Sequence, residues 1–179
     1  TRVRSSAASD VYKRQDRLYV ANSRSGTVTV IAGATNAVLA TVRVGAFPNR
    51  VDVNPATNRV YVTNRNDDTV SVLDGARDTV AATIAVGRHP SAVVVNPATN
   101  RVFVANADDN SVSVLDGSRN RVVATLPAGR QPLGIGINPL SQRVYLANRA
   151  ATRFRSFRIT ASGYRVAASQ PLPGCPMQT

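Results

Sequence analysis

Side chains capable of binding or acid–base chemistry gather in short loops that recur at a fixed spacing along the 179-residue chain. Each loop is polar and lies between apolar segments. The apolar segments are similar from one repeat to the next, whereas the loop residues differ. Variation inside a constant framework is typical of positions that determine what a protein binds. The candidate ligand-binding residues are Arg65, Asn66, Asp67, Asp68, Arg88, His89, Asp108, Asp109 and Arg130.

Two arginines and the single histidine carry the first candidate chemistry. Arg88 and Arg130 occupy equivalent loop positions 42 residues apart, so we expect both at one rim, where guanidinium groups can hold a carboxylate or a phosphate. The alternative is that both are solvated surface charges. His89 is either a ligand-facing general base or metal ligand, or a half-exposed loop residue. The second interpretation is favoured, because the chain has no second histidine and no glutamate to complete a site.

The acidic pairs Asp67–Asp68 and Asp108–Asp109 offer oxygen atoms of the kind that calcium binds. Their loops lack the alternating ligands of a dedicated calcium site, so the sequence predicts that these carboxylates cap the turn before the next strand. The chain has no G-x-S-x-G, Walker, C-x-x-C or H-x-x-H motif. We therefore predict no catalytic residue, no metal and no cofactor, and we favour a binding protein over an enzyme.

The chain is strongly basic, with a net charge of +12, of which +9 lies outside residues 1–15. Such a charge attracts polyanions, including nucleic acid, but the arginines are spread along the chain, which a GC-rich genome also explains. No apolar run approaches the roughly 20 residues that span a membrane. The single Cys175 cannot form an internal disulfide bond.

The elements that must position the loops repeat with a period of 42 residues. Units begin at Arg17, Arg59, Arg101 and Arg143, and the second and third are identical at 20 of 42 positions. Apolar residues alternate with period two in four short segments per unit, which predicts four β-strands and no helix. Four antiparallel strands repeated every 40-odd residues are typical of a β-propeller blade.

Repeated residues outside the loops are interpreted as structural. Gly75 and Gly117 are expected to adopt the positive φ of a tight turn. The asparagines that end the second strand are expected to bond the backbone of the following loop: Asn22, Asn64, Asn106 and Asn148. The aromatic residues of that strand are expected to pack between blades: Tyr19, Tyr61, Phe103 and Tyr145.

The segments "YVTN" at 61–64, "YVAN" at 19–22, "FVAN" at 103–106 and "YLAN" at 145–148, together with "TVSVLD" at 69–74, carry a family resemblance. The chain resembles the YVTN-repeat β-propellers, which are the YncE-like or lactonase-like propellers. The resemblance implies a full-length protein that is a closed, monomeric ring of about seven blades. It also implies a periplasmic or extracellular location.

The chain is predicted to be an all-β propeller fragment of about three and a half blades. Within residues 16–179 we expect a partial blade at 17–44, which lacks its first strand, and complete blades at 48–86 and 90–128. A degenerate blade follows at 132–170, whose strand pattern is lost after about Ile159. An open arc leaves apolar end faces exposed, so we expect the isolated chain to be marginally stable or to aggregate. A dimer of half-rings is the lesser alternative.

Residues 1–15 form a separate segment that we predict to be non-native. They contain Lys13, the only lysine of the chain, and "SSAASDVYKRQ" at 5–15 resembles a sequencing adapter translated in frame. The alternative is a flexible tail rich in serine and alanine.

Three functions are compatible with these features. The first is a non-catalytic scaffold that binds a protein or a small anionic ligand through the variable rim loops. The second is a lactonase-like hydrolase or lyase with most of its active site in blades outside this chain. The third is a binder of polyanions or nucleic acid through the basic surface.

Overall fold

The fold was examined in a computed structural model. It describes the backbone of residues 11–14, 16–138, 140–149, 153–160 and 163–171, and the side chains of residues 16–138 and 140–149. The described backbone forms sixteen strands in four antiparallel sheets of four strands each. The described residues contain no helix of the length and apolarity that a bilayer crossing requires.

Each sheet is a meander in which consecutive strands are hydrogen-bonded neighbours. The first sheet contains β1 (Val11–Arg14), β2 (Arg17–Asn22), β3 (Thr27–Ala32) and β4 (Val38–Arg43). The second contains β5 (Pro48–Asn54), β6 (Arg59–Asn64), β7 (Thr69–Asp74) and β8 (Thr79–Ala85). The third contains β9 (Pro90–Asn96), β10 (Arg101–Asn106), β11 (Ser111–Asp116) and β12 (Arg121–Pro127). The fourth contains β13 (Pro132–Asn138), β14 (Arg143–Asn148), β15 (Arg153–Thr160) and β16 (Gly163–Pro171).

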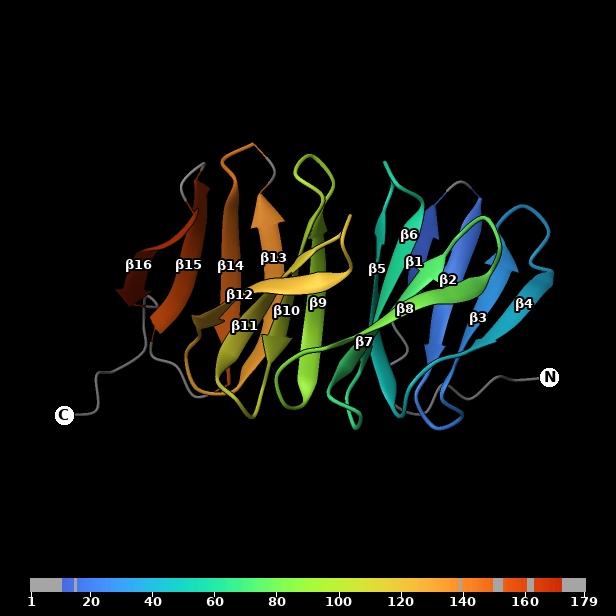
Figure 1. The fold of residues 1–179 in the computed structure, drawn as a ribbon, viewed down its shortest axis with the longest axis horizontal. Helices are drawn as coiled ribbons and strands as arrows, with labels where there is room; N and C mark the ends of the chain where they lie inside the picture. The colour runs from blue at the N-terminus through green and yellow to red at the C-terminus, as the bar shows by residue number, and fades with distance from the viewer. Residues whose placement is uncertain (1–10, 15, 139, 150–152, 161–162, 172–179) are drawn as a thin grey trace.

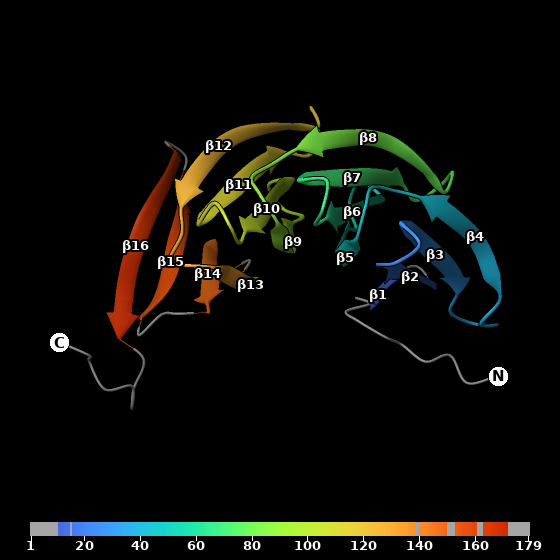
Figure 2. The ribbon, with the colours of Figure 1, turned by 90° about the horizontal axis from the view of Figure 1, so that it is seen from below.

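The four sheets fan around a common axis and form an open arc. Figure 1 shows the sheets side by side in chain order, and Figure 2 shows the outer strands β4, β8, β12 and β16 along the convex side. The first strands of neighbouring sheets lie next to one another on the concave side, as the contacts of β5 with β9 and of β9 with β13 require. The predicted partial β-propeller is confirmed.

Alternating side chains give the sheets two apolar faces, and the facing sides of adjacent sheets pack together in three seams. In the first seam, Tyr19 and Val28 of the first sheet pack with Val60 and Leu73 of the second. Equivalent clusters join the second sheet to the third and the third to the fourth. The predicted packing of the aromatic residues between blades is therefore observed for Tyr19, Tyr61 and Phe103, which are at most 2% exposed.

The two glycines of the repeated turns do not adopt positive φ, so that expectation was wrong. The left-handed residue of each turn is its last, Asp78 with φ 53° and Asn120 with φ 49°, because asparagine and aspartate tolerate this region. Gly75 and Gly117 are required for space instead. A Cβ atom on Gly117 would lie 2.7 Å from the hydroxyl oxygen of Tyr61 in the preceding sheet.

The asparagines that end the second strands bind strand hydroxyls, not the loop backbone as predicted. Nδ2 of Asn64 donates to Oγ1 of Thr69 and to Oγ of Ser71, both at 2.9 Å. The same pair of bonds recurs at Asn22 and Asn106. Because hydroxyls five and seven residues ahead point at the amide, each asparagine ties its own strand to the next strand.

Asn148 has lost these partners. The residues five and seven positions ahead of it are Arg153 and Arg155, and arginine has no hydrogen-bond acceptor. Among the residues whose side chains the structure describes, neither Nδ2 nor Oδ1 of Asn148 has a hydrogen-bond partner, and both atoms are buried. The fourth unit keeps the asparagine but not the interaction that it serves in the other three.

Two strands extend beyond the sequence expectation. The first unit was expected to lack its first strand, but Val11–Arg14 pairs with β2, because extended backbone of almost any sequence can complete an exposed strand edge. Two residues separate β1 from β2, whereas Pro55–Asn58 separate β5 from β6, so β1 does not follow the repeat. The proposed non-native origin of residues 1–15 stays a prediction. In the fourth sheet, β16 pairs with β15 to Pro171, well past Ile159.

Candidate functional site

Loops of two kinds lie at the same end of each sheet. One kind enters each sheet from the preceding sheet, at residues 44–47, 86–89 and 128–131, and the other joins the second and third strands, at residues 65–68 and 107–110. Their backbones are hydrogen-bonded: the N–H of Arg65 donates to the carbonyl of Phe47, and that of Ala107 to the carbonyl of His89. We call this end the rim. All nine candidate binding residues lie in these loops.

The acidic pairs hold the entering loops in place. Oδ2 of Asp67 accepts the N–H of Ala46 at 2.6 Å, and Oδ2 of Asp109 accepts that of Arg88 at 2.7 Å. The carboxylates were predicted to cap their own turns. That prediction missed these bonds, because the receiving backbone belongs to a loop 21 residues away and only the fold brings the two together.

A second set of bonds joins the loops of neighbouring sheets. Oδ1 of Asp68 accepts the N–H of His89 at 2.8 Å, and Oδ1 of Asn110 accepts that of Gln131 at 2.7 Å. His89 and Gln131 have φ of 50° and 48°, a conformation that costs a residue other than glycine about 1 kcal/mol or more. The side-chain bonds therefore stabilise a strained backbone at the rim.

One ion pair and one histidine–carboxylate contact connect the third sheet's loops. Nε of Arg88 lies 2.6 Å from Oδ1 of Asp109, and Nδ1 of His89 lies 2.5 Å from Oδ2 of Asp108. The hydrogen bond from Arg88 lowers the pKa of Asp109, and the same bond raises the pKa of Arg88. Since both pairs are largely exposed, they orient side chains more than they stabilise the fold.

A pocket of about 420 Å³ opens between the third and fourth sheets. Its lining is almost wholly polar: Arg88, Ala107, Asp108, Asn110, Arg130 and Gln131. We call it the polar rim pocket. Arg88 is neutralised there by Asp109, whereas the exposed guanidinium of Arg130 makes no hydrogen bond or ion pair with any residue whose side chain is described. Arg130 is thus an available cation at the mouth of a concave site.

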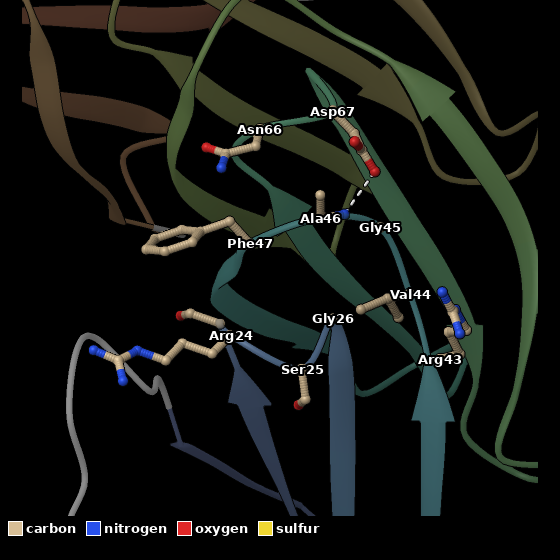
Figure 3. Close-up of a pocket in the computed structure, with 11 residues that line it drawn as sticks. Arg24, Ser25, Gly26, Arg43, Val44, Gly45, Ala46, Phe47, Asn66 and Asp67 are labelled. Atoms are coloured by element: carbon tan, nitrogen blue, oxygen red, sulfur yellow. Dashed lines mark hydrogen bonds between the residues drawn. The ribbon is translucent and has the colours of Figure 1, made fainter.

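A second pocket, of about 490 Å³, lies between the first and second sheets. Figure 3 shows Phe47 and Arg24 on one side and Asn66 and Asp67 above, where the N–H of Ala46 donates to Asp67. It is less polar than the first pocket because Val44, Ala46 and Phe47 line it. The two pockets occupy equivalent places in the repeat and differ in chemistry through the residues of the entering loops.

Most of the predicted residues are brought together at these pockets. Arg88, Asp108 and Arg130 share the polar rim pocket, and Asn66 and Asp67 line the second pocket. Four predicted residues line neither of these two pockets: Arg65, Asp68, His89 and Asp109. The prediction did not select Asn110 and Gln131, although Asn110 occupies the position of Asp68 one period later. Among the described residues, no group of three or more histidine, cysteine or acidic side chains is placed to hold a metal ion.

Comparisons with known proteins agree with this architecture. The sequence model of a family described as YNCE-like beta-propeller matches residues 49–167. A comparison with curated proteins finds no match. Among solved structures, hydrazine synthase from Kuenenia stuttgartiensis is similar with a TM-score of 0.81 and 24% identity, over 92% of this chain and 48% of that chain.

A second similar structure is a functionally unknown protein from Desulfotomaculum acetoxidans DSM 771. Its TM-score is 0.78 at 16% identity, over 92% of this chain and 56% of that chain. The present chain therefore spans about half the length of both structures. At these identities the likeness concerns the fold alone.

Proposed function

The chain belongs to the YNCE-like β-propeller family, and from that premise we propose that it is a binding scaffold whose rim loops hold a small anionic ligand. The strands and seams build the repeated frame, and the loops present the residues that differ from one unit to the next. Ligand sites of this kind are concave and contain a few fixed polar groups.

The observation that carries the proposal is Arg130 in the polar rim pocket. Its guanidinium has no partner among the described side chains, while its equivalent, Arg88, is paired with Asp109. A carboxylate suits a guanidinium because two oxygen atoms match the forked N–H donors. Asn110 and Gln131 add amide groups on the same lining, and Asp108 disfavours ligands of high negative charge. A small mono- or dicarboxylate therefore fits best.

The test is a titration of the whole chain with succinate, followed by calorimetry or by NMR of the arginine side chains. We expect saturable binding that weakens about tenfold or more in Arg130→Gln, because a hydrogen bond to a charged group contributes about 1.5–3 kcal/mol. Arg121→Gln is the matched control, since Arg121 is an exposed arginine of β12 outside the pocket. Equal binding by both variants, or no binding by the wild type, would contradict the proposal.

A hydrolase is the second candidate, and the His89–Asp108 pair favours it. A carboxylate on Nδ1 orients an imidazole so that Nε2 can take a proton from water. Hydrolysis of γ-butyrolactone by the wild type and by His89→Gln measures this directly. A rate above the buffer background that His89→Gln abolishes would support the hydrolase over the scaffold.

A further inference from the structure

The rim of the first seam lacks a side-chain bond that the other two seams have. In the second seam, Oδ1 of Asp68 accepts the N–H of His89 at 2.8 Å, and the third seam repeats this bond. The equivalent residues of the first seam are Gly26 and Phe47. Glycine offers no side-chain acceptor, and the N–H of Phe47 makes no hydrogen bond with any described residue. A backbone donor is therefore available there.

The backbone is the same at both seams, so the missing bond does not come from a different loop shape. The carbonyls of Gly26 and Asp68 each accept an N–H of the entering loop at 2.9 Å. The φ angle is 65° at Gly26 and 55° at Asp68, and it is 55° at Phe47 and 50° at His89. By this equivalence, the N–H of Phe47 points to the place that a carboxylate oxygen occupies in the second seam.

The second pocket, of about 490 Å³, lies at this place and is lined by both Gly26 and Phe47. Two exposed arginines, Arg24 and Arg43, also line it, and neither makes a hydrogen bond or an ion pair with any described residue. The one acidic residue of the lining is Asp67, whose Oδ2 already accepts a backbone N–H. The pocket thus combines a free backbone donor with a net positive charge, which favours an anion.

The remaining lining is apolar and determines the body of the ligand. Val44, Ala46 and the half-buried Phe47 line the pocket. Figure 3 shows the ring of Phe47 and the side chain of Arg24 extending to the same side, whereas Arg43 lies on the opposite side, beyond Val44. An aromatic ring prefers to pack on another in an offset or edge-to-face arrangement. A flat apolar group can therefore lie on Phe47 while its acidic group meets Arg24.

We propose that the second pocket binds an aromatic monocarboxylate, whose carboxylate takes the place that the Asp68 carboxylate has in the next seam. One oxygen accepts the N–H of Phe47, the guanidinium of Arg24 pairs with the carboxylate, and the ring packs on Phe47. A second carboxylate would lie against the apolar part of the lining, so a dicarboxylate fits less well. The site shares no lining residue with the polar rim pocket, so the two binding proposals stand or fall separately.

An NMR titration of the full 179-residue chain with phenylacetate tests the site. We expect saturable binding that shifts the amide signal of Phe47. Binding should be at least tenfold weaker for phenylacetamide, which lacks the charge, and for acetate, which lacks the ring. Arg24→Gln should weaken phenylacetate binding about tenfold or more, because it removes a charge-assisted hydrogen bond. Arg121→Gln is the matched control, since Arg121 is exposed and lies outside this pocket, and it should bind like the wild type.

Gly26→Asn tests whether ligand and side chain occupy the same place. It gives the first seam the acceptor that Asn110 supplies in the third, and asparagine tolerates the left-handed backbone. We expect phenylacetate to raise the melting temperature of the wild type, and Gly26→Asn to melt higher without ligand and to bind none. If this variant does not fold, Arg24→Gln against its control decides. No saturable binding by the wild type, equal affinity for phenylacetamide, or undiminished binding by either Gly26→Asn or Arg24→Gln would overturn the proposal.

Discussion

The hydroxyl of Tyr61 in the second sheet lies against Gly117 of the third, so closely that a Cβ atom on Gly117 would be 2.7 Å from its oxygen. That hydroxyl is buried and has no hydrogen-bond partner, and burial raises the pKa of Tyr61. The next unit lacks both this buried hydroxyl and the glycine. Phe103 replaces the tyrosine, and the position of Gly117 is then taken by Ile159.

We therefore expect Tyr61→Phe to leave the free energy of unfolding unchanged or to raise it by about 1 kcal/mol, because it deletes an unsatisfied buried hydroxyl. Gly117→Ala should destabilise the wild type by about 1–3 kcal/mol through overpacking against Asn100 and Tyr61. The loss should be smaller in the Tyr61→Phe background, but it should not vanish, because Asn100 remains. Urea unfolding of both single variants and the double variant measures the coupling. If the changes in the free energy of unfolding of the two single variants add up to that of the double variant, the two side chains do not compete for this space.

The asparagine that joins the second and third strands gives a second prediction. Asn64→Ala removes two hydrogen bonds and leaves two strand hydroxyls unpaired, so the free energy of unfolding should fall by about 1–3 kcal/mol. Asn148→Ala is the matched control, because its amide group has no hydrogen-bond partner among the described side chains. Thermal or urea unfolding distinguishes the two variants. Equal losses at both positions would mean that the bonds to Thr69 and Ser71 contribute nothing specific.

An ion pair present in one seam is missing from the next. Nη1 of Arg17 lies 2.6 Å from Asp78. The equivalents Arg59 and Asn120 make no such pair: Nη1 of Arg59 lies 3.1 Å from Asp74 of its own sheet, and Oδ1 of Asn120 is buried without a hydrogen-bond partner among the described residues. Asn120→Asp should therefore stabilise the chain by up to about 1 kcal/mol, and 1 M salt should reduce the gain. Asp78→Asn is the reciprocal control and should destabilise. The prediction fails if Asn120→Asp lowers the urea midpoint at low salt.

Acid sensitivity should concentrate at Asp116, which is 3% exposed. Its carboxylate accepts the Ser118 hydroxyl at 2.6 Å and also pairs with Arg101 at 2.8 Å. These bonds hold its pKa well below the usual range. A folded-state pKa below the unfolded value of about 3.9 adds stability that is present above that value. The contribution is lost as the pH falls towards the folded pKa.

Unfolding measured between about pH 6 and pH 2 tests this assignment. Asp116→Asn should be less stable than the wild type near neutral pH, by about 1–3 kcal/mol, and should lose less of its remaining stability on acidification. Ser118→Ala removes the first of the stabilising bonds and should shift the acid transition to higher pH. An acid transition that is unchanged in both variants would place the sensitive carboxylate elsewhere.

The repeat made the fold predictable, because a period of 42 residues with two-residue alternation specifies sheets, their order and their seams at once. What escaped prediction depends on contacts between units. The bond from the N–H of Ala46 to Asp67 joins loops 21 residues apart. Val11–Arg14 pairs with the open edge of β2, and this pairing could not be predicted because residues 11–14 do not follow the repeat. Gly117 was identified as a turn residue, yet the side chains of Asn100 and Tyr61 leave no space there for a Cβ atom.

The candidate site was predictable in location but not in charge balance. Equivalent positions placed Arg88 and Arg130 at one pocket, as the period required. The sequence shows Ala151 in the fourth unit where the third has Asp109. It could not show that this position pairs with the arginine of the entering loop, because the contact of Asp109 with Arg88 depends on the fold. A difference of one side chain between units thus separates a structural arginine from a candidate binding arginine.

Every sheet meets its neighbours through the same two faces, and that uniformity bears on how such a chain can change in length. Gain or loss of one 42-residue unit recreates a junction of a type already present and leaves the other junctions untouched. Unequal crossing-over between such similar stretches of coding DNA would therefore yield folded products of different size, while point changes in the loops alter what each product recognises.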